Sequence, residues 1–269
     1  MSELCQRYGV SRAGYYVSTR REASHHDEQD RWLYARIQAI HIASEGTYGS
    51  PRIQRALAEA GHHVGGKRVA RLMRENGLKA RAAKLYHPNP GTHTFFSSVP
   101  NRARKRRVSK PDQVWLGDIT YLNVGGQWRY LAAVMDRYSR RIVGWSLGSN
   151  KDARLTLRAF NHAMRKRAAE PGLIFHSDRG IEYAAFAFKT RLAALGVRQS
   201  MNRRGRPTDN AHMESFFHSM KSDVIHGRTL KSEEEVYRIV RRYIVFYNRT
   251  RLHSALDYHS PIDYERAAA

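Results

Sequence analysis

Three carboxylates in the second half of the chain could together hold divalent cations. Asp118 stands in the otherwise apolar run V-W-L-G-D-I-T-Y-L, Asp178 ends the run L-I-F-H-S-D, and Glu214 lies in D-N-A-H-M-E-S-F-F. An acidic side chain inside an apolar strand is costly to bury unless it is paired or bound to a metal. Converging carboxylates repel one another, and divalent cations relieve that repulsion. Hard oxygen ligands suit Mg²⁺ or Mn²⁺, so this set predicts a metal site.

The chemistry of such a site would be phosphoryl transfer. Two ions about 3.5–4 Å apart can clamp the attacking and the leaving oxygen of an in-line displacement. One ion would activate water or a 3′-hydroxyl, and the other would stabilise the leaving oxygen. Lys221 follows Glu214 by seven residues, which places it nearly above Glu214 on a helix. Its ammonium could hold a phosphate close to the scissile bond.

The helix that carries Glu214 is predicted to begin after Asp209, which is well placed as its N-cap. Its buried stripe is predicted to contain Met213, Phe217, Met220 and Val224. Glu214 lies at the edge of that stripe. On an isolated helix a solvated glutamate would be the simpler interpretation, and the two upstream aspartates are what favour a site.

An α/β domain over residues 112–265 would position these side chains. Alternation of period two predicts strands over 114–122, 128–135 and 141–147, and short apolar runs predict two more over 173–178 and 197–201. Helical patterns separate the later strands, and a long helix follows a capping box of Ser232 and Glu235. The order of elements predicts a mixed five-stranded sheet with helices on both faces.

The charge of the chain predicts a polyanionic partner. Its 269 residues contain 47 Lys and Arg against 24 Asp and Glu, a formal net charge of +23. Such a charge predicts salt-dependent attraction to nucleic acid. An anionic membrane surface is the alternative, but the sequence shows no apolar run of 18 residues and no signal peptide. The single cysteine, Cys5, excludes an internal disulfide and a Cys-rich zinc site, which indicates a reducing, cytoplasmic setting.

Three segments precede the α/β domain. Residues 1–29 predict a short helical segment with a polar connector over 17–29, and residues 30–83 predict three helices with a basic last one. Such a trio suits a helix-turn-helix domain that binds DNA, although a helical bundle with a solvated basic face is the alternative. Residues 84–111 predict a basic, proline-containing linker that follows phosphates.

Several cations in these segments are candidate DNA contacts. Those of the third helix are Lys67, Arg68, Arg71 and Arg74. Those of the linker are Arg104, Lys105, Arg106 and Arg107. Those of the loop before the Glu214 helix are Arg203, Arg204 and Arg206.

Five motifs of the chain resemble insertion-sequence transposases of the IS-three type, in their catalytic subunit. These motifs are W-L-G-D-I-T-Y, F-H-S-D-R-G-I-E-Y, S-M-N-R-R-G, D-N-A-H-M-E-S-F-F and Y-N-R-T-R-L-H-S-A-L. The family belongs to the retroviral-integrase-like superfamily with a ribonuclease H fold. Thirty-five residues lie between Asp178 and Glu214, which matches the D-D-35-E pattern of that family. Residues 30–80 are similar to its helix-turn-helix region and residues 112–265 to its integrase core.

The resemblance implies a metal-dependent cut at transposon ends, followed by attack of the freed 3′-hydroxyl on another phosphodiester. It implies that Asp118, Asp178 and Glu214 hold two Mg²⁺ or Mn²⁺ ions and that Lys221 contacts DNA. The implied partners are double-stranded DNA of the terminal repeats and the target, and further copies of the chain in a dimer or larger assembly. Family members often also need a first-reading-frame helix-turn-helix and leucine-zipper protein. The implied location is the bacterial nucleoid.

Two positions depart from the family pattern, and some alternatives stay open. Gly117 stands where threonine is expected and Asn202 where serine is expected, which we ascribe to packing or loop shape. A non-catalytic DNA-binding regulator and a nuclease without strand transfer are the alternative functions. Asp136 is either a fourth ligand or the start of a β-turn, and His253 is either near the site or structural. A zinc site through His176 and His212 is the weakest alternative, because H-E-x-x-H is absent.

Overall fold

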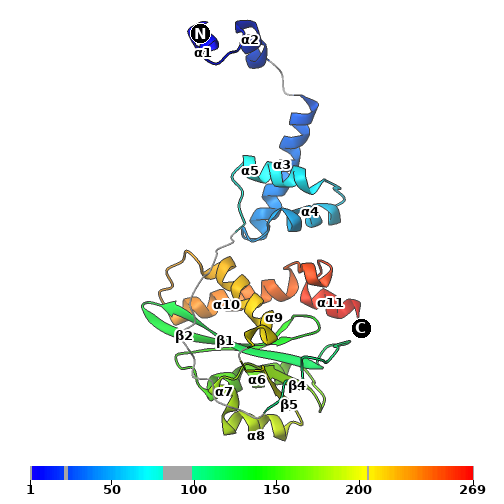
Figure 1. Ribbon diagram of the computed structural model, residues 1–269, viewed down its shortest axis with the longest axis vertical. Coiled ribbons are helices and arrows are strands. Elements are labelled where there is room, and N and C mark those ends of the chain that lie inside the picture. Colours follow the sequence, from blue (N-terminus) through cyan, green and yellow to red (C-terminus); the bar gives the residue numbers. More distant parts are fainter. Residues whose placement is uncertain (1, 21–23, 81–98, 205, 269) are drawn as a thin grey trace. The chain divides into compact units, whose positions relative to one another are not determined.

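The chain folds into two compact units, Met1–Ala80 and Arg81–Ala269 (Figure 1). The computed structural model describes residues 2–20, 24–80, 99–204 and 206–268. Most of the predicted linker, residues 84–98, therefore lies outside the described residues. In the described parts of the chain, no helix has both the length and the apolar character needed to cross a membrane.

Helices are the regular elements of the first unit in its described residues. Its helices are α1 (Ser2–Arg7), α2 (Arg12–Arg20), α3 (His25–Ala43), α4 (Ser50–Glu59) and α5 (Gly66–Glu75). The apolar faces of the last three helices form a core of Leu33, Ile37, Ile53, Leu57, Val69, Leu72 and Met73. This trio confirms the predicted three-helix region.

The polar connector predicted over residues 17–29 is wrong. Helix α2 extends to Arg20, and α3 begins at His25. Ser24 and Asp27 form a capping box, in which the Ser24 side chain accepts from the Asp27 N–H and the Asp27 carboxylate accepts from the Ser24 N–H. This cap starts α3 before its apolar pattern becomes visible, so the expected domain limit at residues 29–30 falls inside a helix.

The second unit is built on the mixed five-stranded sheet that the sequence predicts. Its strands are β1 (Val114–Val124), β2 (Gln127–Asp136), β3 (Ile142–Gly148), β4 (Ile174–Ser177) and β5 (Arg198–Met201). Their order in the sheet is β3-β2-β1-β4-β5. The first three strands pair antiparallel, whereas β1, β4 and β5 pair in parallel. The strand β1 thus lies at the centre of the sheet.

Helices cover both faces of this sheet (Figure 1). The helices are α6 (Ala153–Lys166), α7 (Ile181–Ala184), α8 (Phe186–Ala194), α9 (Ala211–Met220), α10 (Glu233–Arg249) and α11 (Pro261–Ala267). One core joins β1 and β2 to α9 and α10, and the other joins the opposite face of the sheet to α6 and α8. The predicted helices on both faces are confirmed.

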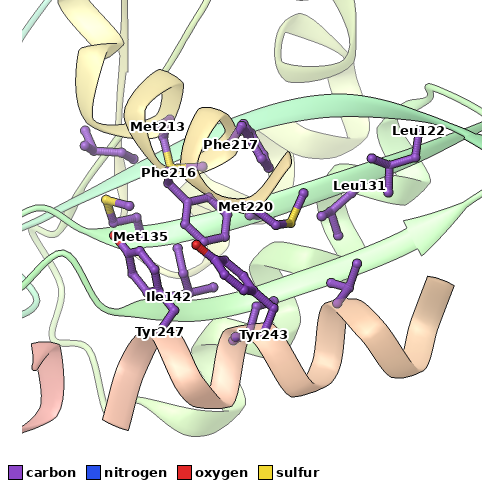
Figure 2. Packing of buried hydrophobic residues seen from close by; sticks show 14 of the residues in the cluster. Leu122, Leu131, Met135, Ile142, Met213, Phe216, Phe217, Met220, Tyr243 and Tyr247 are labelled. Atoms are coloured by element: carbon purple, nitrogen blue, oxygen red, sulfur yellow. The ribbon is translucent and has the colours of Figure 1, made fainter. Parts of the chain in front are cut away.

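Helix α9 buries the stripe that its sequence predicts. Met213, Phe217, Met220 and Val224 are all buried. Figure 2 shows the first three, together with Phe216, packed between the strands and the tyrosines of α10. This packing fixes the face that α9 turns to the sheet and leaves Glu214 on its exposed side.

The predicted N-cap of α9 is wrong. Asn210 is the N-cap residue, and a 3₁₀ turn, η1 (Pro207–Asn210), precedes it. The Asn210 side-chain amide donates to the Gly117 carbonyl at 3.1 Å, which ties the start of α9 to β1. The Asp209 carboxylate instead accepts from Asn101 and Arg203.

The end of α9 passes into a π-helical turn, η2 (Lys221–Ile225). Asp223 in this turn is buried and accepts from the Tyr243 hydroxyl at 2.9 Å and from Arg251 Nε at 3.3 Å. These contacts attach the turn to α10 and to Arg251, which lies between α10 and the 3₁₀ turn η3 (Ser254–Leu256). π-helical turns are rare and often occur at functional sites.

Gly117 has a packing reason, as the sequence interpretation expected. A Cβ atom at this position would lie 2.4 Å from Cζ of Phe175, which belongs to the core on the α6 and α8 side. Threonine would overlap that ring. Glycine at position 117 thus leaves room for the ring of the phenylalanine at position 175.

Candidate active site

Asp118 and Asp178 are brought together by the parallel pairing of β1 and β4. Gly117 on β1 lies opposite Ser177 on β4, so the two aspartates follow paired positions on neighbouring strands. The Ile119 N–H donates to Asp118 Oδ1 at 2.8 Å, and the Gly180 N–H donates to Asp178 Oδ1 at 3.0 Å. Each carboxylate is thus oriented by the backbone N–H of a residue that follows it closely in the chain.

The electrostatics of this pair suit a bound cation. Burial, and then the negative charge of Asp178, raises the pKa of Asp118 to about 8. Burial also raises the pKa of Asp178, with a smaller contribution from the nearby Glu182. A divalent cation relieves this cost by supplying positive charge between the oxygens. The donor set of two hard carboxylates therefore fits Mg²⁺ or Mn²⁺.

Glu214 stands apart from this pair in the structure. Its side chain is exposed in the first turn of α9. Within the described residues, no three histidine, cysteine, aspartate or glutamate side chains form a group that could hold a metal ion. The structure thus brings two of the three predicted carboxylates together, on the strands, and leaves the third on the helix that packs against β1.

Lys221 faces the central strand. Its Nζ lies 4.5 Å from the centre of the Tyr121 ring, a cation–π contact. Burial lowers the pKa of Lys221, and the charge of Asp118 acts in the opposite direction. The lysine is thus within electrostatic reach of Asp118.

Two charged residues beside the aspartates were missed by the sequence analysis. Glu182 in α7 is only 3% exposed, and its carboxylate forms an ion pair with Lys151 at 3.2 Å. The charges of both residues act on Asp118 and on Asp178. The available signal was the motif D-R-G-I-E-Y, in which a glutamate stands between two large apolar residues.

The basic residues of α5 are divided between internal pairs and solvent. Arg68 and Arg71 both bind Asp30 of α3, at 2.7 and 2.5 Å. Arg71 also pairs with Glu75 at 2.9 Å. The other two predicted contacts of this helix, Lys67 and Arg74, are exposed. Two of the four predicted DNA contacts therefore also hold α3 against α5.

The cations at 104–107 belong to a segment, residues 99–108, that we call the basic strap. Its Arg102 N–H donates to Ser200 Oγ at 2.8 Å, and its Ala103 carbonyl accepts from Arg137 Nη1 at 2.6 Å. Ala103 is buried in the core of the second unit. The four predicted contacts, Arg104, Lys105, Arg106 and Arg107, are exposed, as is Arg102. The described end of the predicted linker is thus anchored to the α/β unit with its charges outward.

Asp209 joins the basic strap to the loop before α9. Its side chain is 7% exposed and pairs with Arg203 at 2.9 Å. Its Oδ2 also accepts from Asn101 Nδ2 at 2.9 Å and from the Arg203 N–H at 2.9 Å. Arg204 and Arg206 in the same loop are exposed. One carboxylate thus fixes both segments next to the helix that carries Glu214.

We expect Asp209→Asn to lower the free energy of unfolding by about 1–3 kcal/mol, because it removes hydrogen bonds to a charged group. Arg203 holds the pKa of Asp209 below its usual range. Because the folded-state pKa is depressed, this stabilisation is present above the unfolded pKa of about 4 and is lost as pH falls through the folded pKa. Urea denaturation at pH 7 and at low pH measures the effect.

The matched control is Asp257→Asn, at an exposed position with φ +50° that asparagine also adopts. Equal losses of stability in the two variants would contradict the role of Asp209.

Asp136 and His253, whose roles the sequence left open, are both part of the packed structure. Asp136 is fully buried and accepts from the N–H groups of Asp112, Tyr138 and Ser139, so it begins a turn as the simpler interpretation expected. Burial raises its pKa to about 6. His253 is buried against the Tyr247 ring, 4.6 Å between ring centres.

The two histidines of the zinc alternative do not share a site with the aspartates in the described part of the chain. His176 is buried, and its Nδ1 lies 2.9 Å from Ser200 Oγ. Burial lowers the pKa of His212 to about 4.

Comparison with known proteins places these features in a family. The family profile described as integrase core domain matches residues 108–207, a second profile of that description matches residues 195–261, and an HTH-like domain matches residues 27–86. A protein of insertion element IS600 from Shigella sonnei is 36% identical over 96% of this chain and 96% of its own. Transposase InsF of insertion sequence IS3A from Escherichia coli is 34% identical over 97% and 92%.

Among solved structures, the catalytic core domain of HTLV-2 integrase in complex with magnesium is similar at 13% identity. The match covers 59% of this chain and 99% of that one, with a TM-score of 0.46.

The sheet order, the helices on both faces and the matched profiles define an integrase core of the ribonuclease H-like fold. The chain belongs to the family of IS3-type insertion-sequence transposases. Its general activity is therefore DNA transposition, as a polynucleotidyl transferase with an additional HTH-like domain.

Proposed function

We propose that this chain cleaves the ends of an insertion sequence and joins the freed 3′-hydroxyl to another phosphodiester. The observation that carries the proposal is the half-buried pair of Asp118 in β1 and Asp178 directly after β4, which the parallel pairing of these strands brings together in an integrase core. Two partly desolvated carboxylates that repel each other are costly to the fold, which favours a catalytic purpose over a purely structural one.

Asp118 and Asp178 hold Mg²⁺ or Mn²⁺ in this proposal, and Glu214 completes the set. Two divalent ions bound there would supply activation of the attacking hydroxyl and stabilisation of the leaving oxygen. The backbone donors Ile119 and Gly180 orient the two aspartates before any ion arrives. Glu214 moves toward the two aspartates when metal and DNA bind, and the Asn210 contact keeps the start of α9 next to β1. The Lys221 ammonium binds a phosphate of the DNA beside the site.

The DNA is held over several basic segments. We assign DNA binding to residues 30–83 through Lys67, Arg68, Arg71 and Arg74, and catalysis to residues 112–265. Arg104, Lys105, Arg106 and Arg107 on the basic strap and Arg203, Arg204 and Arg206 in the loop before α9 contact phosphates near the site. Two DNA ends are held by a dimer or a larger assembly of this chain.

A joining assay tests the proposal. The full chain is incubated with a library of labelled duplexes carrying candidate terminal sequences, a second unlabelled duplex and Mn²⁺. We expect branched joined products, because the freed 3′-hydroxyl attacks the second duplex. A parallel reaction with EDTA should give none.

Two other results of this assay would overturn the proposal. Cleavage without joining would favour a nuclease of the same fold, and binding without cleavage would favour a DNA-binding regulator.

A further inference from the structure

An ion pair of unassigned purpose, with a buried carboxylate, lies beside the two aspartates. Glu182 in α7 is 3% exposed and pairs with Lys151, which precedes α6, at 3.2 Å. The Lys151 side chain is 35% exposed, so its ammonium sits at the border between the buried carboxylates and solvent. Buried charges are rarely kept unless they interact with other charged groups.

The chain is shaped so that the Glu182 carboxylate can approach Asp178. A Cβ atom at Gly180 would lie 2.6 Å from Glu182 Oε1 and 3.0 Å from Asp178 Oδ1. Carboxylate oxygens of Glu182 and Asp178 thus occupy the space that a side chain at position 180 would take. Any residue other than glycine at position 180 would push the two carboxylates apart.

We propose that Lys151, held by Glu182, is a built-in counter-ion of the aspartate pair that sets how tightly the site binds a divalent cation. The proposal rests on the metal site of the proposed function. Lys151 and Glu182 are positioning residues in this scheme, since they act through Asp118 and Asp178.

The charge balance gives the reason. When all three are ionised, Asp118, Asp178 and Glu182 bring three negative charges close together, and Lys151 supplies one positive charge that acts on both aspartates. Without a metal, this ammonium lessens the repulsion between the carboxylates. When a divalent cation is present, the same ammonium repels it. Lys151 therefore stabilises the metal-free site and weakens metal binding.

The ion pair could instead serve only to hold α7 near the start of α6. That role predicts that loss of Lys151 would leave cation affinity unchanged or weaken it, because a loosened site binds less well. The counter-ion role predicts the opposite sign, which makes the two roles distinguishable by a binding measurement.

The experiment measures Mn²⁺ binding to the full-length chain by calorimetry, without DNA. We expect Lys151→Met to bind Mn²⁺ about tenfold more tightly than wild type, because one positive charge near the site is removed. The same variant should unfold at a lower temperature than wild type in EDTA and regain stability in Mn²⁺. Lys151→Arg, which keeps the charge, should bind within about threefold of wild type.

Two further variants complete the set. Arg154→Met removes one cation from α6 at a side chain that is 79% exposed, and its Mn²⁺ affinity should equal that of wild type. Glu182→Gln should weaken Mn²⁺ binding about tenfold, because the site loses a negative charge. If Lys151→Met does not fold, Glu182→Gln still tests the inference.

The outcomes separate this inference from the proposed function. Equal affinity of Lys151→Met, Glu182→Gln and wild type, with binding still abolished by Asp178→Asn, would overturn the counter-ion role alone. If wild-type protein binds no Mn²⁺, or if Asp178→Asn binds it as wild type does, the metal site itself is wrong and both proposals fall.

Discussion

Replacement of Asp178 by asparagine is expected to abolish DNA cleavage and joining, with a loss of at least about 10²–10³-fold in rate. The substitution keeps the shape of the side chain but removes the charge that would hold a cation with Asp118. Its effect on folding should be small or favourable, because partial burial raises the pKa of Asp178 and so favours a neutral side chain there. DNA affinity should stay at the wild-type level. Gel assays of cleavage and joining in Mg²⁺, with binding measured in parallel, give both quantities.

The matched control is again Asp257→Asn, which makes the same chemical change at an exposed position. It should cleave as wild type does. Cleavage by Asp178→Asn at the wild-type rate in Mg²⁺ would falsify the role assigned to this carboxylate.

The affinity of the chain for duplex DNA is expected to fall steeply with salt. A chain with net charge +23 that contacts about 6–10 phosphates would lose about 10³–10⁵-fold in affinity between about 50 and 200 mM salt. Each phosphate contact adds about −0.9 to the slope of log K against log salt. A fluorescence-anisotropy titration at several salt concentrations measures the slope.

The basic strap should account for part of that slope. The variant Arg104→Gln/Arg106→Gln is expected to reduce its magnitude by about 1.8, because two phosphate contacts are lost. Arg238→Gln/Arg241→Gln removes the same charge from the exposed face of α10 and is the control. A slope that changes equally in both variants would show that only net charge matters, and a flat wild-type titration would contradict phosphate contacts altogether.

The framework of the catalytic unit could be predicted from the sequence because its signals are local. Alternation along 114–122 and 128–135 and the glycines at 125 and 126 predict a hairpin without knowledge of any distant contact. The structure confirms the hairpin of β1 and β2, with Gly125 and Gly126 at positive φ. The stripe of α9 was predictable for the same reason, since its period follows from the helix alone.

Contacts between distant segments could not be read in this way. Asp209 has the sequence context of an N-cap, but it binds Arg203 and Asn101 instead, and Asn101 lies far upstream in the basic strap. A carboxylate takes the strongest donors that the fold brings to it, and a guanidinium is a stronger partner than a backbone N–H. Local spacing carries no information about such a choice.

In the candidate site, too, local signals could be predicted and contacts between distant segments could not. The acidic residues stood out because Asp118 interrupts an apolar strand, whereas Glu182 was overlooked because a glutamate in a helix is ordinarily solvated. It packs against Gly180 in its own turn and pairs with Lys151, which comes from a separate segment. The position of Glu214 outside the aspartate pair could not be predicted either. Sequence spacing predicts that Glu214 lies on a helix, but it does not predict where that helix packs.

The most direct test of the metal site is a crystal structure of the full chain with Mn²⁺ and a duplex end, in which anomalous scattering locates the ions. We expect Mn²⁺ between Asp118 and Asp178, with a Glu214 oxygen at ligand distance of about 2.0–2.2 Å from an ion. Mn²⁺ bound elsewhere, or held by the two aspartates while Glu214 keeps the exposed position that it has without metal, would contradict it.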